Sequence, residues 1–182
     1  MIELLKTYIQ NKDSEKAIEL KNSFSFHEAI VCGKIEIVNS YFEKSNSNLV
    51  NTHSSDGFTP LSLAAFFNQT AIAKLLIENG ADPNLSATNP SKVNALHSAI
   101  AKEHYELCKI LLEKGANVNA TQIQNVTALH AAVHRGNLTL TKLLIENGAS
   151  IGLKMDNGDT PLIIAKREDH KNIVHCLLNK QN

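Results

Sequence analysis

Residues 127–133 read TALHAAV, and this heptad recurs along the chain. Closely similar stretches are TPLSLAA at residues 59–65, NALHSAI at 94–100 and TPLIIAK at 160–166. Their starts lie 35, 33 and 33 residues apart, and FSFHEA at residues 24–29 falls at the same spacing before the first of them. A nearly constant period of this length indicates an array of stacked supersecondary units.

A second block recurs in step with the first. It reads LLIENGAD at residues 75–82, ILLEKGAN at 110–117 and LLIENGAS at 143–150. Its apolar residues follow helical spacing, and the glycine after them suits a helix end that needs a left-handed residue. The first block opens on Thr or Thr-Pro, which suits a helix start, and continues with alanines that let neighbouring helices approach. Each unit is therefore expected to hold two helices.

Both blocks resemble the ankyrin repeat, with its Thr-Pro-Leu-His helix start and its Gly-Ala-Asp block. The resemblance covers about residues 24–182 and implies an all-α repeat fold, an α-solenoid of helix-turn-helix units with β-hairpin loops. The expected repeats span approximately residues 24–55, 56–88, 91–121, 124–154 and 157–182. Residues 1–23 fall outside the repeat, and their apolar positions predict two short helices that cap the first unit. The polar residues of the last unit predict a C-terminal cap, since the ends of a stack need a polar outer face.

The third repeat departs from this pattern. Asn-Ala replaces Thr-Pro at residues 94–95, and the loop at 86–93 is two residues longer than the later loops. Glu103 stands at a turn position that is glycine in two other repeats. These changes predict an irregular hairpin here. Asn125 replaces a glycine at the next hairpin tip, where Asn tolerates a positive φ.

Composition narrows the classes of partner. The formal net charge is zero and the sequence pI is about 7.1, so the basic excess typical of nucleic-acid binders is missing. No window is apolar enough for a membrane span, and the N-terminus has no basic region followed by a long apolar stretch. We expect a cytoplasmic monomer with no nucleic-acid partner and no membrane insertion, while export by a non-classical route stays open.

Few residues suggest chemistry. His27, His97 and His130 occupy the His position of the repeat, and the resemblance implies that each hydrogen-bonds the backbone between repeats. His130 and His134 lie four residues apart and could share a helix face as metal ligands, but no Glu-containing zinc-protease motif surrounds them. We expect no catalytic residue, no metal site and no cofactor.

The three cysteines are far apart and suggest no disulfide framework. By its place in the repeat, Cys176 is expected in the core and Cys108 partly buried nearby. Cys32 is expected at the exposed end of a first helix.

In ankyrin proteins the hairpins and the ends of the first helices line a concave face that binds partners. The resemblance places nine candidate partner-binding residues on this face: Phe58, Phe66, Phe67, Val93, Lys102, Ile123, His134, Arg135 and Arg167. Three of the six phenylalanines fall there and would form an apolar half with Val31, because exposed aromatic clusters mark interfaces. The alternative is that these rings pack against a neighbouring hairpin or the N-terminal helices.

These observations favour a non-enzymatic protein-interaction module that acts as a scaffold, an adaptor or an inhibitor. A bacterial host-directed effector or an immunity-type inhibitor would use the same face. We expect the partner to place an apolar anchor near Phe66 and Phe67 and acidic groups near Arg135 and Arg167. An enzyme is disfavoured because only about 20 residues lie outside the repeats. A purely architectural segment of a longer protein is the third reading.

Overall fold

The computed structural model describes residues 24–43 and 47–180, so the predicted helices within residues 1–23 lie outside the described residues. Helices follow one another in pairs. The first helices are α3 (Phe26–Val31), α5 (Pro60–Phe66), α7 (Ala95–Ala101), α9 (Ala128–His134) and α11 (Pro161–Arg167). The second helices are α4 (Ile35–Glu43), α6 (Thr70–Glu78), α8 (Tyr105–Glu113), α10 (Leu138–Glu146) and α12 (Lys171–Leu178). Two short 3-10 helices, η1 (Ser47–Asn51) and η2 (Ile123–Asn125), lie in the connections.

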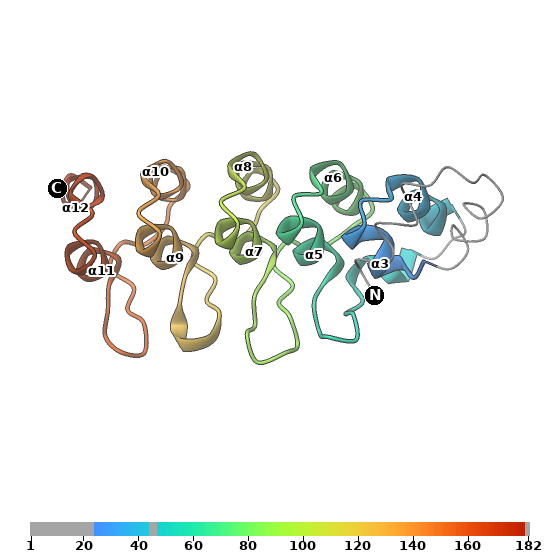
Figure 1. The fold of residues 1–182 in the computed structure, drawn as a ribbon, viewed down its shortest axis with the longest axis horizontal. Coiled ribbons are helices and arrows are strands. Elements are labelled where there is room, and N and C mark those ends of the chain that lie inside the picture. Colours follow the sequence, from blue (N-terminus) through green and yellow to red (C-terminus); the bar gives the residue numbers. More distant parts are fainter. Residues whose placement is uncertain (1–23, 44–46, 181–182) are drawn as a thin grey trace.

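The pairs stand side by side in one row (Figure 1), and this confirms the all-α repeat stack. The first helices form one layer and the second helices form another. The loops between pairs project on the side of the first helices, away from the second ones.

Side-chain caps begin the first helices, as the repeated Thr predicts. The Thr59 hydroxyl oxygen accepts a hydrogen bond from the Ser62 N–H at 3.0 Å, and Pro60 occupies the first turn. In the third repeat the Asn94 side-chain oxygen accepts from the His97 N–H at 3.0 Å. The replacement of Thr by Asn therefore keeps the cap.

One turn position joins the two helices of every pair and has a positive φ in all five. The angles are 69° at Gly33, 56° at Asn68, 58° at Glu103, 69° at Gly136 and 55° at Asp169. Glu103 thus adopts the conformation of the two glycines, although a side chain makes this region unfavourable. Its turn is regular, and the irregularity of the third repeat lies elsewhere.

The irregularity lies in the loop before α7. In three loops a backbone N–H donates to the carbonyl four residues later: Ser54 to Phe58 (2.8 Å), Gln122 to Val126 (2.9 Å) and Met155 to Asp159 (2.9 Å). The equivalent bond in the third repeat joins Ala87 to Val93 at 2.8 Å and spans two more residues, as predicted. Within residues 47–180 the predicted hairpins take the form of such closed loops, with one antiparallel bridge between Thr121 and Thr127. Asn125 has a φ of 55°, which confirms its predicted conformation.

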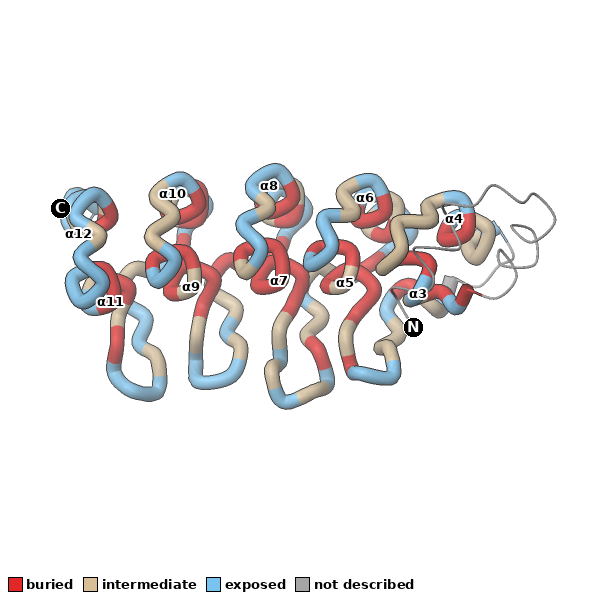
Figure 2. The backbone as a smooth tube through the Cα atoms, in the orientation of Figure 1, coloured by how far each residue is buried: buried red, intermediate tan, exposed pale blue. Residues whose placement is uncertain are grey.

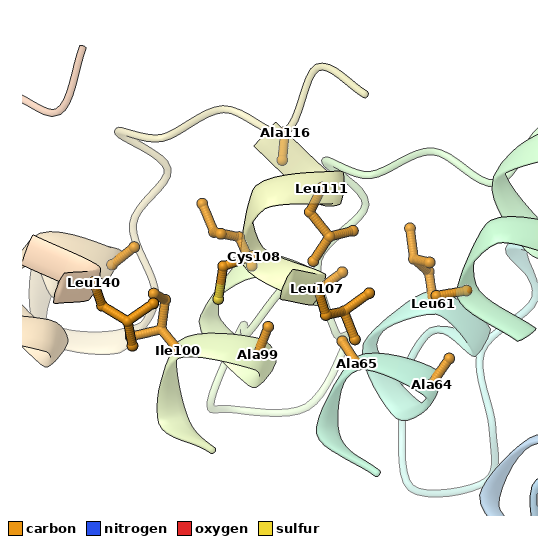
Figure 3. Close-up of a cluster of buried hydrophobic side chains, with 14 of the residues drawn as sticks. Leu61, Ala64, Ala65, Ala99, Ile100, Leu107, Cys108, Leu111, Ala116 and Leu140 are labelled. Atoms are coloured by element: carbon orange, nitrogen blue, oxygen red, sulfur yellow. The ribbon is translucent and has the colours of Figure 1, made fainter. Parts of the chain in front are cut away.

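The core lies between the two helix layers and continues from pair to pair. Figure 2 shows buried residues along the inner sides of the helices and exposed residues at the loop tips. Leu61, Leu96 and Leu129 are buried, and the small residues Ala64, Ala65 and Ala99 are fully buried where first helices meet. Figure 3 shows α5, α7 and α8 contributing side chains to one cluster, with Leu107 and Leu111 facing the alanines. Leu162, in the last pair of the row, is only half-buried.

An asparagine ladder ties each repeat to the next. The Asn84 amide donates to the Gly115 carbonyl at 3.0 Å, and its oxygen accepts from the Asn117 N–H at 2.7 Å. Asn51 and Asn119 make the same two bonds one repeat before and one repeat after. The next position of the ladder is Gly152, which has no side chain to continue it.

The repeat histidines behave as predicted in two of three cases. The Nε2 atoms of His27 and His130 lie 2.9 and 3.1 Å from the carbonyls of Thr52 and Leu153 in the following loops. His97 is buried, but its Nε2 has no hydrogen-bond partner at suitable geometry. The carbonyls of Ala120 and Val126 nevertheless favour its protonated form, although burial dominates and lowers the pKa of His97 to about 4.

The predicted order of burial of the cysteines was wrong. Cys108 is fully buried within α8, and burial raises the pKa of its thiol to about 12. Cys176, which was expected in the core, is only half-buried on α12, and Cys32, which was expected at the exposed end of a first helix, is half-buried at the C-cap of α3. Cys176 matches Leu75 in the repeat, and that leucine is itself only half-buried, so the position lies at the edge of the core.

Candidate partner-binding surface

The ends of the first helices form a row in which the residues differ from repeat to repeat. We call it the helix-end row; it comprises residues 31–32, 66–67, 101–102, 134–135 and 167–168. Each pair of residues lies at the last residue of a first helix and the cap that follows it. The pairs read Val-Cys, Phe-Phe, Ala-Lys, His-Arg and Arg-Glu, so the row changes from apolar to charged along the stack.

Two aromatic side chains stand exposed in the second repeat. Phe66 is 40% exposed and Phe67 is 41% exposed, and their rings meet edge to face with centroids 5.2 Å apart. The carbonyl of Phe66 also lies 3.4 Å from Nε2 of His104, which ties the end of α5 to the next repeat. Both rings therefore keep an exposed part beside the described loops. The N-terminal helices, which are the other neighbour in the alternative, are predicted within residues 1–23, outside the described residues.

Lys102 completes this cluster from the next repeat. Its Nζ atom lies over the Phe66 ring, 4.4 Å from the centroid. An ammonium group is attracted to the negative face of an aromatic ring, so this contact holds the lysine against the phenylalanine. We call Phe66, Phe67 and Lys102 the aromatic patch.

The other basic candidates of the row form ion pairs within the protein. Arg135 lies 3.7 Å from a carboxylate oxygen of Glu103, one repeat earlier. The Asn137 amide donates to the second oxygen of Glu103 at 3.0 Å. His134 Nδ1 lies 3.7 Å from Glu168, one repeat later.

Arg167 is the most strongly paired of these cations. Its guanidinium donates to the Asp159 carboxylate at 2.7 Å and lies 3.6 Å from Glu168. The Arg167 hydrogen bond holds the pKa of the Asp159 carboxyl below its ordinary value, and Asp159 raises the pKa of Arg167 in return. The charged part of the row is therefore neutralised by its own carboxylates.

The remaining candidates lie on the loops. Phe58 and Val93 are half-buried, whereas Ile123 is 49% exposed at the start of η2. Backbone bonds connect successive loop tips: the Ile123 N–H donates to the Ser91 carbonyl at 3.1 Å, and the Asp156 N–H donates to Gln124 at 3.0 Å. Of the nine candidates, Phe66 contacts both Phe67 and Lys102. The structure places the two arginines and His134 among carboxylates.

Sequence reasoning missed the role of Glu103. It identified this residue only as a departure at a turn, although it pairs with Arg135 in the next repeat. The two residues lie 32 positions apart, nearly one repeat period, and residues one period apart are neighbours in a stack. A search for opposite charges at this spacing would have identified Glu103 and Arg135 as candidates for such a pair.

The histidines considered as metal ligands do not converge. His130 is buried and bonded to Leu153, whereas the His134 side chain is 67% exposed. In residues 24–43 and 47–180, no group of three or more His, Cys, Asp or Glu side chains has an arrangement that could hold a metal ion. None of the described helices is long and apolar enough to cross a membrane.

A shallow groove of about 380 Å³ runs between α10 and α12 on the layer of second helices. Lys142, His175 and Lys180 line it together with Cys176. These side chains point to no particular ligand, and the groove shares no residue with the helix-end row.

Comparison with known sequences gives a consistent result. A family model described as ankyrin repeats (3 copies) matches residues 26–122, a second for ankyrin repeats (many copies) matches 111–165, and a third for the ankyrin repeat matches 157–182. Human ankyrin repeat and KH domain-containing protein 1 is 29% identical over 55% of this chain and 4% of its own length. Bovine ankyrin repeat family A protein 2 is 38% identical over 36% of the chain and 20% of its own length. Human transient receptor potential cation channel subfamily A member 1 is 31% identical over 58% of the chain and 10% of its own length. The chain therefore matches only a small part of each of these relatives.

Proposed function

Because the chain belongs to the ankyrin repeat family, a family of protein-interaction modules, we propose that it binds a protein partner through the helix-end row and the adjoining loops. One observation carries this proposal: Phe66 and Phe67 are adjacent, their rings are in contact, and both residues are about two-fifths exposed. Paired exposed aromatic rings cost solvation free energy unless a partner covers them, and aromatic side chains are frequent anchors of interfaces.

The same surface argues for binding without catalysis. Phe66 and Phe67 present aromatic rings on this surface, and its charged residues His134, Arg135, Arg167 and Glu168 lie in ion pairs. We infer that the protein acts as a scaffold, an adaptor or an inhibitor of its partner.

The double variant Phe66→Ala/Phe67→Ala tests the proposal. We expect the dissociation constant for the natural partner to rise about tenfold or more, because truncating aromatic anchors typically costs over 1 kcal/mol each. The measurement is affinity capture from the native cell with the wild-type chain, followed by titration of the purified partner with the wild-type and variant chains.

Tyr105→Ala is the matched control, since Tyr105 is 38% exposed but lies on α8 in the other helix layer. This variant should keep wild-type affinity, and circular dichroism should show equal helicity for all three chains. A partner that binds the double variant as tightly as the wild type would refute the proposed surface.

A further inference from the structure

We propose that the aromatic patch binds a short extended segment of the partner in which a large apolar side chain stands two residues from a carboxylate. The apolar side chain covers Phe66 and Phe67, and the carboxylate pairs with Lys102. This inference rests on the proposed function and specifies the chemistry of the ligand.

The charges of the row decide where an acidic group can bind. The sequence alone suggested Arg135 and Arg167, but these cations already pair with Glu103, Asp159 and Glu168. An incoming carboxylate would be repelled at either site by the carboxylate that is already paired there. The basic end of the row is therefore a poor receptor for an acidic ligand.

Lys102 differs from the arginines in its surroundings. Its ammonium group sits on the Phe66 ring at 4.4 Å, and none of the ion pairs formed by the described residues includes it. The ring holds the ammonium in place without neutralising its charge, because a cation–π contact leaves the N–H donors on the other side available. Lys102 is thus an oriented cation with no anionic partner among residues 24–43 and 47–180, and it lies next to two exposed aromatic rings.

The spacing of these groups matches an extended peptide. The Phe66 centroid lies 4.4 Å from Lys102 Nζ and 5.2 Å from the Phe67 centroid, so the cation and both rings form one continuous surface. Side chains on one face of an extended strand are about 7 Å apart at positions i and i+2. One such pair of side chains can cover the rings and reach the ammonium together. A basic side chain in place of the carboxylate would be repelled.

A random peptide display library selected against the purified full-length chain tests this inference. The wild-type chain should enrich peptides that hold an aromatic or large aliphatic residue two positions from Asp or Glu. Lys102→Glu should enrich peptides with the same apolar residue but with Lys or Arg in place of the acid. Lys142→Glu is the matched control, because it reverses an exposed lysine on α10, outside the patch, and it should select the wild-type motif.

The enriched peptides are then synthesised, and their affinities are measured by fluorescence polarisation for each variant. We expect Lys102→Glu to weaken the acidic peptides by about fivefold or more, and Phe66→Ala/Phe67→Ala to weaken them by about tenfold or more. Two results would overturn this inference and leave the proposed function standing. In the first, the peptides require the two phenylalanines but show no preference for Asp or Glu. In the second, the Lys102→Glu chain keeps the preference for Asp or Glu that the wild type shows. Peptides that bind equally to Phe66→Ala/Phe67→Ala would overturn both. Failure to enrich any peptide above the library background would refute a short segment as the ligand.

Discussion

His97 shows at the scale of one residue how burial sets a response to pH. Its side chain is 4% exposed between repeats, and burial lowers its pKa from 6.5 to about 4 because the charged ring would lose its hydration. In the unfolded chain the same ring binds a proton near pH 6.5. Between these two values the unfolded state holds a proton that the native state does not, so acid favours unfolding.

We therefore expect the free energy of unfolding to fall by up to about 3 kcal/mol from His97 alone as the pH drops from 6.5 to 4. Above pH 6.5 this contribution to stability is fully present. The measurement is urea unfolding at a series of pH values. His97→Gln should flatten the dependence in this window, whatever its effect on stability at pH 7.

His175→Gln is the control for this experiment, since His175 is exposed on α12 and its replacement should leave the pH dependence unchanged. If the His97→Gln and wild-type chains lose stability equally between pH 6.5 and 4, His97 does not carry the response.

At the scale of one element, the end of a helix depends on a single glycine. Gly115 follows α8 with a φ of 87°, and a Cβ atom added there would meet nothing within 4 Å. The cost of a side chain at this position is therefore conformational and not steric. Gly115→Ala should destabilise the protein by about 1 kcal/mol, measured as a lower midpoint in urea unfolding.

Gly152→Ala tests whether the loss of stability comes from the positive φ of Gly115 or from replacing any glycine. Gly152 also has open space around its Cα but does not have a positive φ, so alanine there should be neutral or slightly stabilising. Equal destabilisation by both substitutions would contradict the conformational explanation.

At the scale of the whole molecule, stability depends on coupling between neighbouring repeats. Asn84 links two repeats by its bonds to Gly115 and Asn117, and its side chain is not part of the apolar core. Asn84→Ala should lower the free energy of unfolding by about 1 to 2 kcal/mol, because two hydrogen bonds are lost. It should also broaden the urea transition, since weaker coupling lets parts of the stack unfold separately.

Asn79→Ala tests whether the coupling itself matters. The Asn79 amide donates to the Leu75 carbonyl within the same repeat at 2.8 Å, so its loss should cost less stability and should not broaden the transition. An Asn84→Ala transition as sharp as that of the wild type would show that the ladder does not couple the repeats.

The caps and the turn glycines could be predicted from the sequence because each depends on residues within a few positions of one another. The repeat period could be predicted because the same local pattern recurs along the chain. Thr59 caps α5 through Ser62, three residues away, and the longer loop before α7 is visible as two added residues. The exposure of Phe66 and Phe67, the burial of Cys108 and the pairing of Arg135 with Glu103 were decided only when the repeats packed against one another. These features join residues about one repeat apart, and their geometry depends on the angle and spacing between helix pairs. The sequence by itself therefore determined the stack and the row of helix ends. Only the tertiary structure decided that carboxylates pair with the two arginines. It also decided that Lys102 lies beside the exposed rings with no carboxylate partner among the described residues.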